Sequence, residues 1–206
     1  MSIDLLAALA AFAFVTSITP GPNNLMLMAS GANFGLRRTL PHMLGVGLGF
    51  GFMIICVGLG LARLFDLFPT AKLLLAALSV LYLLWLAWRI GNATAPEAGR
   101  GSGRPMTFFE AAAFQWVNPK AWTMALTAIT LYATGTLWSV LSVAVVFTAI
   151  NLPAVSSWTL LGQGMARFLT SPARLRWFNW TMAALLVASL WPTVAPLFEG
   201  NLDLVP

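Results

Sequence analysis

Two short polar segments interrupt long apolar runs in this sequence. The first is Thr19-Pro20-Gly21-Pro22-Asn23-Asn24 and the second is Asn118-Pro119-Lys120. Proline lacks a backbone N–H and disfavours helical geometry in the residue before it, so each segment should break a helix. A half-helix that starts at a break directs free N–H groups and its positive dipole end toward an anion such as a carboxylate. Carbonyl groups released before the prolines suit an ammonium group, so the two breaks together suit a zwitterion.

The lysine of the second segment lies deep in apolar sequence. A charge at the centre of a bilayer costs about 2.5 to 3.5 kcal/mol, so Lys120 needs a partner or a wet cavity. Three roles are open to it: attracting a substrate carboxylate, switching protonation, or snorkelling to the interface. The acidic residues are all expected at span ends or in loops, which favours a neutral amino acid over a cationic one. They are Asp4, Asp66, Glu97, Glu110, Glu199 and Asp203.

Other polar and small residues inside apolar runs complete the candidate site. Asn151 with Pro153 could line a pathway or form a simple kink, while His42 follows Pro41 and is expected at an interface. Glycines at positions 45, 47, 49 and 51 form two overlapping i, i+4 pairs, which are typical of close helix packing and also permit a dimer. The predicted substrate-binding and translocation residues are Pro20, Gly21, Pro22, Asn23, Asn24, Asn118, Pro119, Lys120, Asn151 and Pro153; the predicted packing residues are Gly45, Gly47, Gly49 and Gly51.

The composition describes a membrane protein. Of the 206 residues, 59% are hydrophobic and 8% charged, and the mean hydropathy is +0.84. A soluble fold of this composition would expose large apolar patches, which soluble monomers rarely do. The net charge of +5 does not indicate nucleic-acid binding, because the basic residues lie in short segments between apolar runs rather than along one stripe.

Charge-free intervals predict an all-α integral membrane protein with six transmembrane helices. The expected spans are 4–33, 40–64, 70–90, 107–133, 138–166 and 176–198. They form a single transmembrane domain over 1–206, made of a repeat half 1–90, a flexible polar linker 91–106 and a second half 107–206. Because each half has an odd number of spans, the halves must be inserted in opposite orientations, as in secondary transporters with inverted repeats. The breaks then fall in helices 1 and 4, near the midplane.

The basic residues also predict an orientation. Those expected in the first, third and fifth loops outnumber those in the second and fourth, and loops rich in Lys and Arg face the cytoplasm. Both termini are therefore expected outside the cytoplasm, in a multi-pass membrane protein surrounded by lipid. The majority set is Arg37, Arg38, Arg89, Arg100, Arg104, Arg167, Arg174 and Arg176, against Arg63 and Lys72 on the other side.

The sequence carries no pattern expected of an enzyme or of a cofactor or metal protein. No nucleophile and base pair, metal-ligand cluster or phosphate loop lies within the spans. The leading hypothesis from these residues is a secondary active transporter of small neutral amino acids or their derivatives, which works by alternating access around a central site. The alternatives are a membrane-embedded sensor or assembly factor, and a channel-like metal or ion efflux protein.

The motifs resemble the lysine-exporter (LysE/RhtB) superfamily of amino-acid exporters. The resemblance rests on Thr19 to Asn24, on Gly35-Leu36-Arg37-Arg38, on Leu44 to Phe50, on Tyr82 to Trp88 and on Gln115 to Trp122. It implies a secondary active exporter of amino acids or their derivatives in the bacterial inner membrane, with both termini in the periplasm and protons as the coupling ion. The paired asparagines are similar to the cysteine and O-acetylserine exporter branch. Many members carry an aspartate after Pro-Gly-Pro where this chain has Asn23, so the resemblance does not extend to a carboxylate at that position.

Overall fold

The computed structural model describes residues 1–68, 70–93 and 104–198, and every regular element in these ranges is helical. Most of the predicted linker, with Glu97 and Arg100, lies outside the described residues, as do Glu199 and Asp203. The elements are α1 (Ile3–Ile18), α2 (Pro22–Cys56), the π-helix η1 (Val57–Leu61), α3 (Arg63–Leu67), α4 (Thr70–Gly91), α5 (Phe108–Phe114), the 3₁₀-helix η2 (Gln115–Val117), α6 (Pro119–Tyr132), α7 (Leu137–Ala166), α8 (Pro172–Ala188) and α9 (Trp191–Phe198).

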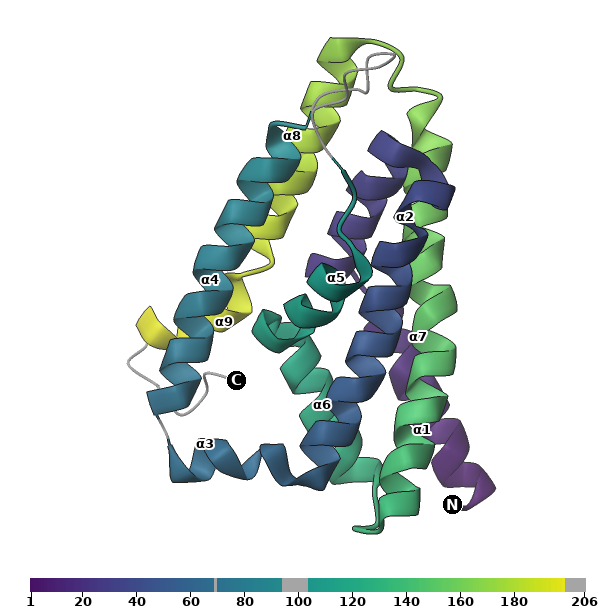
Figure 1. Cartoon of the computed structure of the whole chain (residues 1–206), viewed down its shortest axis with the longest axis vertical. Helices are drawn as coiled ribbons and strands as arrows, with labels where there is room; N and C mark the ends of the chain where they lie inside the picture. Colours follow the sequence, from purple (N-terminus) through teal and green to yellow (C-terminus); the bar gives the residue numbers. More distant parts are fainter. Residues whose placement is uncertain (69, 94–103, 199–206) are drawn as a thin grey trace.

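Within the described residues, four helical stretches are long and apolar enough to cross a membrane. They are Pro22–Leu61, Thr70–Gly91, Leu137–Ala166 and Pro172–Ala195. The prediction of an all-helical membrane protein is therefore confirmed at this level. The helices α1, α5 and α6 are shorter because the chain is interrupted beside them (Figure 1).

The helix α2 contains a reversal of the chain at Gly35. This glycine has φ 76° and ψ 167°, a left-handed conformation that residues with a Cβ rarely adopt. Residues of the chain before Gly35 contact successively later positions of α7, and residues after Gly35 contact successively earlier ones. The two parts of α2 therefore run in opposite directions (Figure 1). In chain order the contacting pairs are Ser17–Asn151, Gly31–Thr159, Leu36–Gln163, Gly47–Leu152, Gly51–Thr148 and Gly58–Val140.

Glycines let α2 approach its neighbours closely. A Cβ on Gly45 or Gly49 would overlap α5, and one on Gly47 or Gly51 would overlap α7. The two predicted glycine pairs therefore contact two different helices of the same chain. Close backbone approach of this kind replaces the hydrophobic driving force that is missing between helices in lipid.

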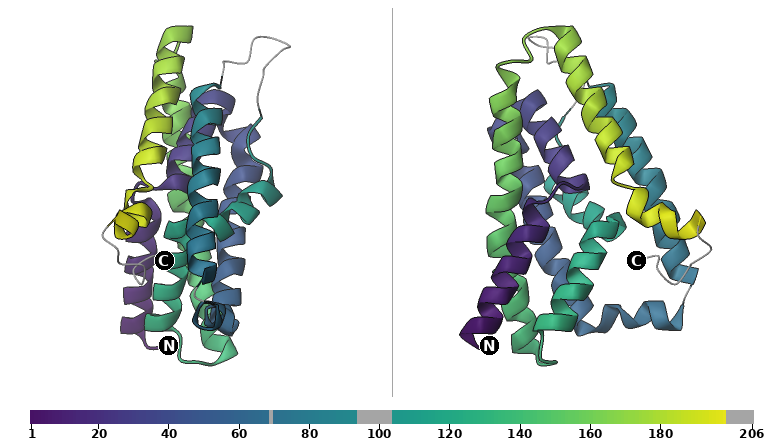
Figure 2. Two further views of the ribbon diagram at one scale, coloured as in Figure 1. Left: turned by 90° about the vertical axis from the view of Figure 1, so that its left-hand side faces the viewer. Right: turned by 180° about the vertical axis from the view of Figure 1, so that it is seen from behind.

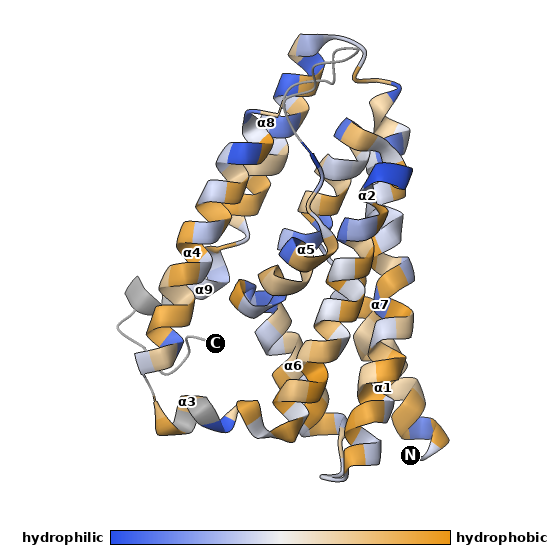
Figure 3. Cartoon of the chain, viewed as in Figure 1, coloured by the Kyte–Doolittle hydropathy of each residue, from blue (hydrophilic) through white to orange (hydrophobic). Residues whose placement is uncertain are grey.

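The helices form two groups, and hydrophilic residues are concentrated at one end of the bundle. Figure 2 shows α4 and α8 running side by side, while α1, α2, α5, α6 and α7 form the other group. Hydrophilic residues gather at the end where α7 passes into α8, and apolar residues cover most of the length between the ends (Figure 3). The described arginines at this hydrophilic end are those at positions 37, 38, 89, 104, 167, 174 and 176.

Candidate functional site

The two predicted breaks share one local construction. After α1 ends at Ile18, Gly21 is fully extended (φ −174°, ψ 178°) and α2 begins with Pro22. After η2, Asn118 is also extended (φ −97°, ψ 108°) and α6 begins with Pro119. In each case proline occupies the first helical position, where its missing N–H costs nothing and its fixed φ suits the helix. The segments singled out in the sequence thus end one helix and start the next.

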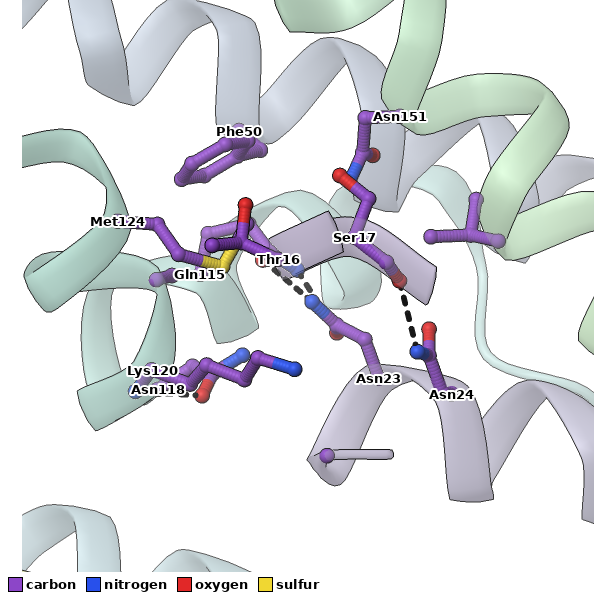
Figure 4. Close-up of a pocket in the computed structure, with 13 residues that line it drawn as sticks. Thr16, Ser17, Asn23, Asn24, Phe50, Gln115, Asn118, Lys120, Met124 and Asn151 are labelled. Carbon is purple, nitrogen blue, oxygen red and sulfur yellow. Dashed lines mark hydrogen bonds between the residues drawn. The ribbon is translucent and has the colours of Figure 1, made fainter. Parts of the chain in front are cut away.

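The structure brings the two breaks into direct contact. The Asn23 side chain donates from Nδ2 to Gln115 Oε1 (2.8 Å), and Gln115 Nε2 donates back to Asn23 Oδ1 (3.2 Å). The Lys120 ammonium donates to the Thr19 carbonyl oxygen (2.8 Å), the Thr19 hydroxyl (2.9 Å) and the Pro20 carbonyl oxygen (3.3 Å). The side chain just after each helix-starting proline therefore reaches across to the other break (Figure 4).

The carbonyl groups released at the end of α1 are bound by the protein itself. Asn24 Nδ2 donates to the carbonyl oxygens of Ser17 and Thr19, both at 2.8 Å. Trp158 Nε1 donates to the Ile18 carbonyl oxygen (3.1 Å). In this structure the carbonyl groups thus accept from side chains of α2, α6 and α7, and their expected role toward a substrate ammonium stays a prediction.

A small cavity lies between the breaks. The space inside it is close to what one water molecule fills. Lys120 is the charged residue among those that line it, and no lining residue is acidic. Figure 4 shows the labelled side chains gathered around this space. The lining residues are Thr16, Ser17, Gly21, Asn23, Asn24, Phe50, Gln115, Asn118, Lys120, Ala121, Met124, Asn151 and Val155.

Some predicted site residues lie away from the cavity. Pro20, Pro22 and Pro119 shape the breaks but do not line the space, and Pro153 is exposed on the outer face of α7. Gln115 is the main functional candidate that was not predicted; its side chain is fully buried and bridges to Asn23. Its polar side chain within the apolar run before Asn118 is the signal that could have identified it.

One acceptor in the cavity has no partner. Asn151 Nδ2 donates to the Ser17 hydroxyl (3.0 Å), whereas its buried Oδ1 accepts no hydrogen bond from any described residue. An unpaired buried carbonyl oxygen costs stability, so such atoms call for an explanation. At the start of α2, likewise, no side chain caps the first-turn N–H groups. The cavity thus offers an ammonium group, backbone donors and an amide acceptor.

Gly21 provides the space in which Lys120 lies. A Cβ at this position would stand 2.7 Å from Lys120 Cδ and 3.1 Å from Lys120 Nζ. The backbone of Gly21 is extended, a conformation open to any residue, so the requirement for glycine here is one of space. Within the described residues, no group of three His, Cys, Asp or Glu side chains could hold a metal ion.

Comparisons with known proteins agree on one family. The model of the LysE type translocator family matches residues 14–189. The chain is 32% identical over 192 residues to the cysteine/O-acetylserine efflux protein of Klebsiella pneumoniae, covering 91% of this chain and 95% of that protein. It is 31% identical over 191 residues to the protein of the same name from Escherichia coli K12, covering 91% and 96%. No solved structure matches the chain.

Proposed function

Because the chain belongs to the family of LysE type translocators, we propose that it exports small neutral amino acids through the cavity between its two helix breaks. It is an amino-acid exporter rather than an enzyme. The main observation in support of the proposed site is the reciprocal contact of the breaks, in which Asn23 is hydrogen-bonded to Gln115 and Lys120 to Thr19. The polar groups of both breaks converge there within an apolar bundle.

The cavity suits a zwitterion. A substrate carboxylate would accept from the Lys120 ammonium and from the uncapped N–H groups at the start of α2, where the helix dipole adds favourable charge. The substrate ammonium would donate to Asn151 Oδ1, the unpaired acceptor. Because no acidic side chain lines the cavity, a second positive charge on the substrate would find no counter-ion. Cysteine and O-acetylserine, which appear in the names of the relatives, are both neutral zwitterions.

Alternating access requires the breaks to separate. The space between them is too small for an amino acid, so a substrate must displace the contacts that hold the breaks together. Lys120 would then exchange its bonds with the Thr19 and Pro20 carbonyl groups for bonds with the substrate carboxylate. This exchange links binding at the cavity to movement of the half-helices on either side.

The architecture proposed for this cycle is a 3+3 inverted repeat of six spans. Two observations support this architecture. The chain reverses at Gly35, so that the parts of α2 before and after it are antiparallel, and the breaks at Pro22 and Pro119 have the same local construction. The arginine-rich end is assigned to the cytoplasm by the positive-inside rule, which places both termini in the periplasm. The alternatives of a sensor and of a metal efflux protein have no such support in the described residues.

Counterflow tests this function. Proteoliposomes containing the purified protein are loaded with unlabelled O-acetyl-L-serine or L-cysteine, and the entry of the same labelled compound is followed. We expect transient accumulation of label, and none in liposomes loaded and assayed with L-lysine. Absence of exchange with every neutral amino acid would refute an exporter of this class, and efficient exchange of lysine would refute the proposed zwitterion site.

A further inference from the structure

A second cavity, with a mostly apolar lining, lies near the arginine-rich end, and His42 is at its buried wall. The imidazole is 2% exposed, and neither Nδ1 nor Nε2 forms a hydrogen bond with any described residue. The structure thus buries His42 among protein side chains, while its expected depth near a membrane interface stays a prediction. The cavity reaches exposed residues, among them Asn92 and Arg104, so water has a route toward the ring.

A buried imidazole with no hydrogen bonds is hard to explain by packing. An apolar side chain of similar size would fill the same space without leaving two polar atoms unpaired. The adjacent hydroxyl groups do not satisfy the ring, because Ser30 Oγ and Thr39 Oγ1 are bonded to each other (2.9 Å) and Thr39 Oγ1 also donates to the Gly35 carbonyl oxygen (2.8 Å). Imidazole is also the side chain that ordinarily changes charge near neutral pH.

The charged groups around His42 come from three neighbouring segments. Arg89 of α4 and Arg104 line the cavity, and Glu110 of α5 is the acidic partner of Arg104. Glu110 is held by Arg104 through hydrogen bonds of 2.6 and 2.5 Å, which raise the pKa of the Arg104 guanidinium.

Several other titratable groups of the surrounding helices have contacts of their own, and the Arg38 guanidinium of α2 lies 5.5 Å from the centre of the Phe34 ring, which also lines this cavity. Tyr82 of α4 packs against Phe114, with ring centroids 5.6 Å apart, and Lys120 of α6 lies in the central cavity. Arg176 of α8 lines a different cavity. The helix α7, Leu137–Ala166, contains no titratable side chain apart from hydroxyl groups.

The part of α2 before Gly35 connects the two cavities. Asn23 at its start lines the central cavity, and Met26, Ser30 and Asn33 on later turns line the cavity of His42. These positions follow helical spacing and so lie along one side of the half-helix. A change of charge at His42 therefore acts on the element whose other end holds the contact between the breaks.

We propose that His42 binds and releases the coupling proton, with the part of α2 before Gly35 as the element that links it to the central cavity. The inference rests on the proposed function and deepens it. In export by proton antiport, the imidazole takes up a proton from the periplasmic side and releases it through the cavity at the cytoplasmic end as the substrate leaves. No bond other than that to the proton forms or breaks.

The test separates exchange from proton-driven accumulation. Wild type, His42→Gln and the control Met106→Leu, which changes another lining side chain without altering charge, are reconstituted and assayed with labelled O-acetyl-L-serine. Counterflow at equal pH needs no net proton transfer, whereas uptake into vesicles with an acidic lumen does. For one proton per substrate, a difference of one pH unit sustains about a tenfold concentration ratio.

We expect His42→Gln to retain counterflow at the wild-type rate and to lose the gradient-driven concentration ratio, while Met106→Leu keeps both. Gradient-driven accumulation by His42→Gln would overturn the proposal, and so would loss of counterflow in a variant that elutes from gel filtration as wild type does. Should His42→Gln not fold, His42→Asn replaces it with the same expectation. Absence of counterflow in the wild type would instead refute the proposed function.

Discussion

At the scale of single residues, the chemistry of this protein depends on which polar atoms are already bonded. Lys120 and Asn24 bind the carbonyl groups at the end of α1, so these carbonyls hold the break together. Asn151 Oδ1 and the imidazole nitrogens of His42 stay unpaired in two different cavities. The paired atoms form the resting contact between the breaks. The unpaired ones are the atoms to which the proposals assign the substrate ammonium and the coupling proton.

Lys120 supplies the residue-scale prediction. In Lys120→Met the chain length of the side chain is kept and its charge is lost, so the substrate carboxylate loses a charged hydrogen bond worth about 1.5 to 3 kcal/mol. We expect the export rate at low substrate concentration to fall roughly ten- to hundredfold, from the same energy. Initial rates of labelled O-acetyl-L-serine uptake into inside-out vesicles measure this.

The matched control is Lys72→Met, because Lys72 is a lysine of α4 that lies outside the central cavity. It should export at the wild-type rate after correction for the amount of protein in the membrane. A wild-type rate for Lys120→Met would remove this lysine from the mechanism.

At the scale of elements, close contact between α2 and α7 is the feature that fixes the frame around the site. The α7 face that meets α2 before its reversal contains Thr159 and Gly162, and a Cβ on Gly162 would overlap the Met28 carbonyl group. Backbone atoms cannot move aside as a flexible side chain can. The frame therefore depends on glycine at particular positions of α7, independently of the polar groups that it holds in place.

Two glycines of α7 give the element-scale prediction. Gly162→Ala would force α2 and α7 apart, and overpacking of this kind typically costs about 1 to 3 kcal/mol or more. Gly164→Ala meets open space and gains helix propensity, so it should be neutral or slightly stabilising. Thermal unfolding in detergent is expected to show a lower midpoint for Gly162→Ala only. Equal midpoints for the two variants would contradict the close contact.

At the scale of the whole molecule, the two ends of the elongated bundle differ in their content of basic residues. Hydrophilic residues gather where α7 passes into α8 (Figure 3), whereas Arg63 begins α3 and Lys72 lies in the first turn of α4, at the opposite end of the bundle (Figure 1). Between the ends, large apolar side chains such as Phe52, Leu81 and Val145 are exposed, as expected for a surface in contact with lipid. The long direction of the bundle is thus the direction in which the protein crosses the membrane.

The loops at the two ends of α7 test the orientation. Thr134 precedes α7 and Thr170 follows it, and both are exposed. With Cys56→Ser as background, Thr134→Cys should react with a membrane-impermeant maleimide once the outer membrane is permeabilised. Thr170→Cys should react only after the inner membrane is opened. The reverse pattern would place the arginine-rich end in the periplasm and overturn the proposed orientation.

The sequence by itself determined the membrane class, the helical fold and the two break segments, because these follow from local composition and from the missing N–H of proline. It also pointed to Lys120 and to the glycines at 45, 47, 49 and 51. Only the tertiary structure decided which breaks meet, since the bonds from Lys120 to Thr19 and from Asn23 to Gln115 join residues far apart in the chain. Tertiary structure also decided that His42 is buried, that Pro153 is exposed on the outer face of α7, and that the freed carbonyl groups accept hydrogen bonds from side chains of the protein. Hydrogen bonds and burial depend on what other segments bring to a side chain, and no local pattern contains that information.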